Sequence, residues 1–195
     1  RAFLFSAAGN DVIGEDEDGN SSLLKILKPF ASGATAGELI NRDALRVALA
    51  GLADSYTKLI RTIRAEPGLA RLPILIHGYD YPFAYPSVDG GAEDPRRPVY
   101  AARDEWLGSA FTAHGIADQG LRREVLIILI NALYQTLTAI AGESDQTLVF
   151  VVDCRGALPR VADWADEIHG TDEGFARVAA RFRETLADAL NRSGA

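Results

Sequence analysis

Three short hydrophobic runs lie along the chain, each bounded by polar, Gly or Pro residues. They occupy residues 2–6, 73–77 and 147–152 and predict strands. Because apolar residues follow one another in them with little alternation, we expect both faces of each strand to be buried. Residues 78–100 have no such pattern and are rich in Pro, Gly and Tyr. A loop of this length is often functional.

Longer stretches with a helical hydrophobic period separate and follow these runs. Apolar residues recur at spacings of three and four over residues 45–63 and again over 175–190, which predicts two amphipathic helices. Residues 121–140 are apolar nearly all round at their middle, which predicts a deeply buried helix. The candidate caps of the first helix are Thr35 with Glu38, at capping-box spacing, and Asn41.

Continuously apolar strands that alternate with long helices indicate an α/β fold. We expect a parallel sheet covered on both faces, with right-handed crossovers. A chain of 195 residues without an internal repeat or a linker predicts one domain over residues 1–195. The chain has no methionine and opens directly in its first predicted strand. We therefore expect the domain to be incomplete at its amino terminus.

Composition excludes several classes of function. The formal net charge is −7 and the basic residues do not cluster, so no nucleic-acid partner is expected. The longest apolar run, Val125–Ile130, is much shorter than the roughly 18 residues of a membrane span. No signal peptide is visible. No phosphate-loop or Gly-x-Gly-x-x-Gly pattern occurs, so no nucleotide cofactor is expected.

Cysteine and histidine are both scarce. The single cysteine, Cys154, excludes an intrachain disulfide, and with only three histidines it also excludes a structural zinc site. We expect Cys154 to be a buried structural thiol. One cysteine suits the cytoplasm and is compatible with export as well.

Polar residues follow the first two predicted strands, where a parallel sheet places its ligands. Gly9 and Asn10 come after the first strand, and an Asn amide held rigidly can donate to a developing oxyanion. The same Gly-Asn-Asp sequence also suits an ordinary turn. His77, Tyr79 and Asp80 come after the second strand and are candidates to line a pocket. A hydrogen-bonded histidine at a strand end is the structural alternative for His77.

A carboxylate and a histidine lie three residues apart between the last strand and the last helix. Asp166 can face His169 and accept its Nδ1–H, which fixes the imidazole tautomer and leaves Nε2 to act as a base. Such a pair arises often by chance. Its position beside the carboxyl end of the predicted sheet is what favours a catalytic role.

Together these segments resemble the SGNH (GDSL-type) hydrolases. Residues 5–11 (Phe-Ser-Ala-Ala-Gly-Asn-Asp) are similar to the Gly-x-Asn-Asp block of that family. Residues 164–175 (Trp-Ala-Asp-Glu-Ile-His-Gly-Thr-Asp-Glu-Gly-Phe) resemble its terminal Asp-x-x-His block, including the Gly-Phe that opens the last helix. Residues 74–82 resemble the strand and loop between those blocks. The resemblance thus runs from the first residues to the last helix.

The resemblance implies a three-layer α/β/α sandwich with a flavodoxin-like parallel sheet. It also implies hydrolysis of a small-molecule ester with no metal and no cofactor; substrates in the family include lipid, acetylated-carbohydrate and thioester compounds. By resemblance, His169 would be the general base, Asp166 its orienting partner and Asn10 an oxyanion-hole donor.

One part of the family pattern is missing. The nucleophilic serine of the family lies in a Gly-Asp-Ser block upstream of the Gly-x-Asn-Asp block, and this chain contains no such block. Ser6 lies too close to Gly9 to replace it, so we expect the nucleophile on a missing amino-terminal segment or on a second chain. The usual proline after the histidine is Gly170. The alternative function is a non-catalytic α/β binding or interaction domain that retained this scaffold.

Overall fold

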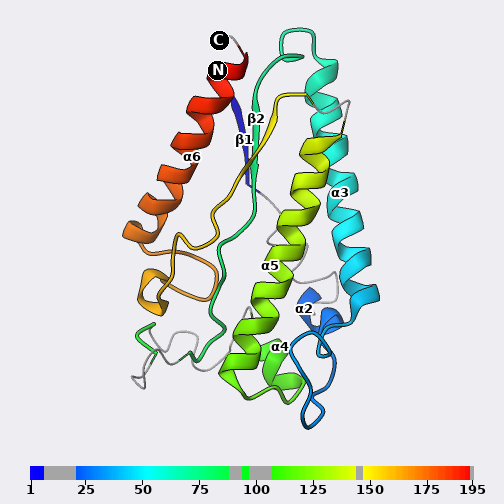
Figure 1. Ribbon diagram of the computed structural model, residues 1–195, viewed down its shortest axis with the longest axis vertical. Helices are drawn as coiled ribbons and strands as arrows, with labels where there is room; N and C mark the ends of the chain where they lie inside the picture. Colours follow the sequence, from blue (N-terminus) through cyan, green and yellow to red (C-terminus); the bar gives the residue numbers. More distant parts are fainter. Residues whose placement is uncertain (7–20, 88–93, 97–106, 144–146, 194–195) are drawn as a thin grey trace.

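The computed structural model describes residues 1–6, 21–87, 94–96, 107–143 and 147–193. In this part of the chain it has an α/β fold with three strands and five α-helices (Figure 1). This confirms the fold class predicted from the alternation of apolar runs and helical periods.

The three strands form one parallel sheet. β1 (Phe3–Phe5), β2 (Ile74–His77) and β3 (Val149–Val152) lie in the order β1-β2-β3. In the register, Phe5 of β1 is opposite Ile76 of β2, which is opposite Val151 of β3. All three strands were predicted, one or two residues too long. Because they are parallel, their carboxyl ends point the same way, toward the level at which α6 begins (Figure 1).

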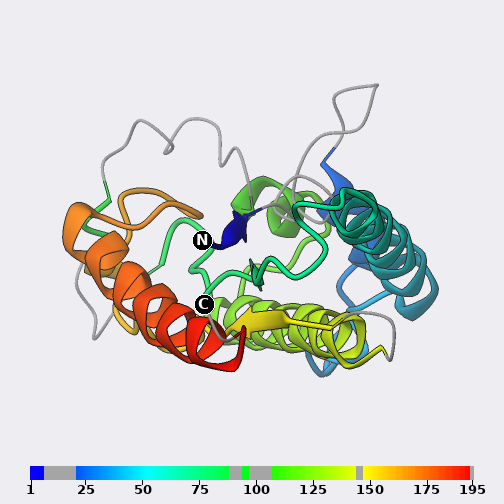
Figure 2. The same ribbon diagram turned by 90° about the horizontal axis from the view of Figure 1, so that it is seen from above.

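Helices pack against both faces of the sheet (Figure 2). On one face, α3 (Arg42–Ala65) and α5 (Gln119–Gly142) pack on Phe3, Phe5, Ile74 and Ile76. On the other face, α6 (Asp172–Ser193) packs on alternate strand residues, Leu75, Phe150 and Val152. This explains why β2 and β3 are hydrophobic on both sides: each face supplies part of a separate apolar cluster. β1 differs, because Leu4 on its second face is 52% exposed, so the prediction that both faces of this strand are buried was wrong.

The first long helix begins at one of its two candidate caps. The side chain of Asn41 accepts the Ala44 N–H at 3.2 Å and caps α3. The other candidate pair also forms, since the Glu38 carboxylate accepts the Thr35 N–H at 2.8 Å and its hydroxyl at 2.7 Å. These two residues close a turn before the helix, so the prediction that they cap α3 was wrong.

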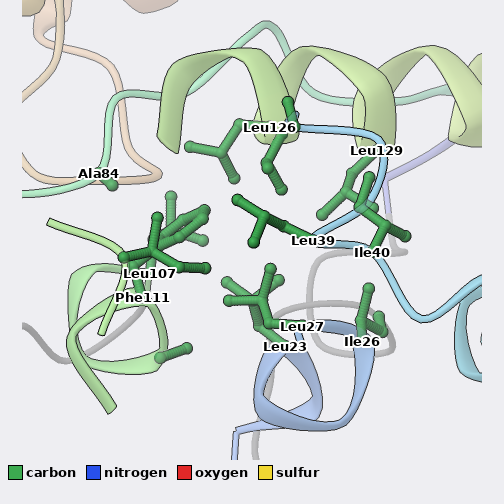
Figure 3. Close-up of a cluster of buried hydrophobic side chains, with 14 of the residues drawn as sticks. Leu23, Ile26, Leu27, Leu39, Ile40, Ala84, Leu107, Phe111, Leu126 and Leu129 are labelled. Carbon is green, nitrogen blue, oxygen red and sulfur yellow. The ribbon is translucent and has the colours of Figure 1, made fainter. Parts of the chain in front are cut away.

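Two short helices were not predicted. α2 (Ser22–Ile26) and α4 (Gly108–Ala113) have five and six residues, too few to show a helical period. They are held by a third apolar cluster, away from the sheet, in which side chains from α2, α4, α5 and the segment before α3 point toward one another (Figure 3). Labelled members are Leu23, Ile26, Leu39, Phe111 and Leu126.

α5 spans residues 119–142, which confirms the helix predicted over 121–140. Nine of its residues are buried, among them Val125, Leu133 and Leu137 against the core clusters. By length and composition alone α5 could also cross a membrane, a test that buried core helices pass too. The absence of a membrane span therefore stays a sequence prediction.

Candidate active site

A pocket of about 300 Å³ opens at the carboxyl ends of the strands. Its lining residues follow the strands and include the first turns of α6, which is where the sequence predicted a site. Five segments contribute to it, from the end of β1 to the first turns of α6. Among its lining residues are Ser6, His77, Tyr79, Cys154, Trp164 and His169.

Asp166 and His169 contact each other as their spacing indicated. Asp166 Oδ2 lies 2.7 Å from His169 Nδ1. The other carboxylate oxygen accepts the backbone N–H of His169 at 2.7 Å and of Ile168 at 2.8 Å. Because a carboxylate accepts, the proton of the neutral imidazole lies on Nδ1 and Nε2 carries the lone pair. The Asp166 side chain is 10% exposed and that of His169 is 55% exposed, so the carboxylate is held inside and the imidazole lies at the pocket surface.

The neighbouring carboxylate, Glu167, fixes the loop that contains Asp166 and His169 to two other segments of the chain. It is 1% exposed and accepts the backbone N–H groups of Tyr85 at 2.6 Å and of Leu107 and Gly108 at 2.8 Å. Three such bonds offset the cost of burying the charge. Asp166 and Glu167 are therefore adjacent in the sequence but have different contacts. Asp166 binds the imidazole of His169, and Glu167 binds the backbone of two other segments and fixes the position of the loop that contains both residues.

A buried arginine supports the loop from another side. Arg96 pairs with Asp94 at 2.7 Å, and its guanidinium donates to the Phe83 carbonyl at 2.6 Å and to the Asp166 carbonyl at 3.3 Å. The Arg96 and Asp94 side chains are 1% and 3% exposed. This pair connects the segment after β2 to the backbone of the Asp166 loop.

Two glycines allow α6 to begin close against this loop. A Cβ at Gly174 would lie 2.5 Å from the Asp163 carbonyl oxygen, and one at Gly170 would lie 2.9 Å from Leu158 Cδ2. Gly174 belongs to the Gly-Phe pair noted in the sequence. Gly170, where the resembled family usually has proline, also lies where a larger residue would push its neighbours aside.

His77 takes part in a second polar pair in the pocket. Its Nε2 lies 2.5 Å from Ser6 Oγ, and its Nδ1 lies 2.6 Å from the Gly78 carbonyl oxygen. The ring packs edge-on against Phe182 of α6, with ring centres 4.9 Å apart. Burial lowers the pKa of His77 below its usual 6.5, while the hydrogen bond to Gly78 acts in the opposite direction.

Cys154 is buried behind His77, as the sequence predicted. It is 1% exposed, and burial raises the pKa of its thiol to about 11. Its backbone N–H donates to the Tyr134 hydroxyl at 2.8 Å. Tyr134 in turn packs on Gly78, where a Cβ would lie 3.0 Å from its ring. The thiol is thus protonated at neutral pH and contributes packing.

Tyr79 and Asp80 both line the pocket, and they differ in what they offer to it. Tyr79 is half-buried, and burial raises the pKa of its phenol. Asp80 is 4% exposed and accepts the backbone N–H groups of Tyr81 at 2.6 Å, Gly156 at 2.5 Å and Leu158. Its carboxylate therefore ties the loop after β2 to the loop after β3.

The remaining predicted site residues, Gly9 and Asn10, lie outside the described residues. Sequence reasoning missed the contact between Ser6 and His77 and the role of Glu167. The Ser6–His77 contact could have been predicted, because Phe5 and Ile76 pair in the parallel sheet and the residues that follow them lie side by side. Among the described residues, no group of three or more His, Cys, Asp or Glu side chains could hold a metal ion. No family model, curated protein or solved structure matches the chain.

Proposed function

We propose that this chain carries the histidine–aspartate half of a serine ester hydrolase of the SGNH type. The observation that supports this most directly is the 2.7 Å contact between Asp166 and His169 at the mouth of a pocket of about 300 Å³. Such a carboxylate–imidazole pair is the arrangement that activates a serine in hydrolytic triads. Helices on both faces of a parallel sheet are compatible with a three-layer α/β/α sandwich, which is the fold we propose.

In this mechanism a serine hydroxyl attacks the ester carbonyl carbon. His169 Nε2 takes the proton of the hydroxyl and then delivers it to the leaving alcohol. Asp166 holds the tautomer that makes Nε2 basic and stabilises the imidazolium as it forms. Asn10 donates to the oxyanion of the tetrahedral intermediate. Water then cleaves the acyl-enzyme by the reverse series of proton transfers.

We propose that the nucleophilic serine is supplied from outside these 195 residues. The Gly-Asp-Ser block that the resembled family uses does not occur in the sequence. Among the described residues, β1 pairs with β2 alone, so its other edge can accept a further strand. A segment or a second chain that pairs there would end beside Ser6 and the pocket.

Labelling with a fluorophosphonate, read by intact mass and peptide mapping, tests this function. A label on a serine of an additional peptide, lost in His169→Ala, is the expected result. A label on Ser6 would place the nucleophile inside this chain and contradict an external serine. No label in folded protein purified with any partner peptide would contradict the hydrolase and favour the non-catalytic binding domain. Ser55→Ala, at an exposed position of α3, is the matched control.

A further inference from the structure

We propose that Ser6 and His77, which both line the pocket, form a recognition pair that binds a hydrogen-bond donor of the substrate. This rests on the proposed function and narrows its substrate class to esters that carry a hydroxyl on the group bound in the pocket. Ser6 follows β1 and His77 ends β2, two neighbouring strands, and both residues line the same pocket as His169.

The hydrogen-bond directions follow from one fixed partner. The Gly78 carbonyl oxygen can only accept, so the 2.6 Å contact places a proton on His77 Nδ1. In the neutral imidazole, Nε2 then carries the lone pair and accepts the hydroxyl proton of Ser6 at 2.5 Å. The single hydroxyl proton of Ser6 is therefore donated to His77. Toward a ligand, Ser6 Oγ can then act only as a hydrogen-bond acceptor.

The same contacts argue against the pair as a nucleophile with its base. His77 contacts a neutral carbonyl, the partly buried ring of Phe182 and the protonated Cys154 thiol, whose sulfur lies 4.0 Å from Nδ1. None of these groups carries the negative charge that would stabilise an imidazolium. His169 has such a charge in Asp166. The pocket thus has one imidazole equipped to take a proton and one equipped to hold a hydroxyl.

The rest of the pocket lining indicates which apolar group the ligand would carry beside its hydroxyl. Around the pair the walls are largely apolar, with Leu158, Ile168 and Val178 among them. A small hydrocarbon group fits such walls, and a hydroxyl on it would meet Ser6 Oγ. A hydroxyacyl ester, or the ester of a polyol, combines the two features.

Binding of non-ester amides tests the pair without requiring hydrolysis. The probes are butanamide, its 2-, 3- and 4-hydroxy derivatives and the corresponding fluoro compounds, which match the hydroxyl in size but cannot donate. Titrations followed by NMR at neutral pH should show at least one hydroxy compound binding about 3- to 10-fold more tightly than its fluoro counterpart, the range of one net hydrogen bond. Equal affinities throughout the series would overturn the proposal.

Variants separate recognition from a general loss of structure. Ser6→Ala should remove the preference for the hydroxyl and leave butanamide binding unaltered, whereas Ser6→Thr, which retains a hydroxyl, should restore it. Ser55→Ala should keep it. ¹⁵N spectra of the His77 ring should show the proton on Nδ1, and a proton on Nε2 instead would contradict the assigned bond directions. A hydroxyl preference in protein that fluorophosphonate fails to label would leave recognition standing and remove only the hydrolase.

Discussion

Two imidazoles line one pocket in this protein, and their surroundings are opposite. His169 is more than half exposed and has a carboxylate on Nδ1. His77 is half-buried and has a neutral carbonyl on Nδ1 and a serine hydroxyl on Nε2. Both rings are held in the same tautomer. The difference lies in the chemistry of the partners: His169 contacts a carboxylate, whereas His77 contacts a carbonyl and a hydroxyl.

This contrast shows why the sequence pattern around a histidine matters more than its presence in a pocket. A carboxylate three residues away supplies His169 with a local counter-charge. His77 is fixed by the carbonyl of the next residue, a group that every histidine has nearby. We therefore propose proton transfer for His169 and hydrogen bonding to the substrate for the Ser6–His77 pair.

The largest expected effect separates the two imidazoles directly. In protein that hydrolyses p-nitrophenyl butyrate, His169→Ala should lower turnover by about 10⁴-fold or more, because the base is lost. His77→Phe should lower kcat by less than about tenfold, because the ring only places Ser6. Steady-state kinetics checks both. Equal losses in the two variants would remove the distinction between them.

The partner of His169 gives the next comparison. In Asp166→Asn the Oδ1 atom can still accept the two backbone N–H groups, but an amide nitrogen then faces His169 Nδ1. The imidazole would turn to the other tautomer, and kcat should fall by about 10⁴-fold while the melting curve changes little. A variant that retains a tenth of the wild-type kcat would show that the carboxylate has no part in proton transfer.

Asn10 is expected to contribute less than either member of that pair. As one of several oxyanion donors, its loss in Asn10→Ala should lower kcat by about 10²- to 10³-fold with little change in KM. Asn10→Asp, which keeps the size and loses the donor, should behave alike. A decrease of less than tenfold in active protein would leave Gly-Asn-Asp as a turn.

Asp80 and Asp153 both follow a strand of the sheet, but the first carboxylate is buried and the second is exposed, so we expect them to differ in what they contribute to stability. Asp80→Ala would leave three backbone N–H groups without their acceptor and should lower the free energy of unfolding by about 3 kcal/mol. The control is Asp153→Ala, which removes a half-exposed ion pair with Arg155 and the acceptor of one backbone N–H, and should cost about 1 kcal/mol. Urea denaturation measures both. Similar values for the two variants would mean that the Asp80 bonds contribute little.

The smallest expected effect is a pH dependence of stability from His77. Its pKa is lowered in the folded protein, so the unfolded chain binds more protons between that value and 6.5. The free energy of unfolding should therefore rise with pH across this interval and level off above it. His77→Gln should flatten that part of the curve. An unchanged slope in the variant would assign the dependence to another group.

Much of the fold could be predicted because its hydrophobic periods are long. The apolar runs around Leu75 and Phe150 gave the strands, and the period from Leu45 to Ile63 gave α3. α2 and α4 could not be found, because five or six residues do not complete two turns and their position depends on a cluster built from distant segments.

The candidate site could be predicted from the sequence only where its contacts join residues close together in the chain. Asp166 and His169 lie within one turn of chain, so their spacing carried the prediction. Glu167 was not singled out and Asp80 was expected only to line a pocket, because their carboxylates accept from N–H groups that are up to 82 residues away in the sequence. Ser6 was set aside for lack of a motif, although its position after β1, next to the end of β2, brought it to His77.

Glu167 also determines how this part of the chain can change in evolution. Its carboxylate accepts the backbone N–H groups of Tyr85 and Leu107, so both ends of the segment between these residues are bound to the same side chain. The ends of the intervening segment are fixed independently of its length. Doubling the length of a flexible loop costs only about 0.6 kcal/mol in closure entropy. Insertions between Tyr85 and Leu107 that leave the buried Asp94–Arg96 pair in place should therefore cost little stability and keep the Asp166–His169 pair in position.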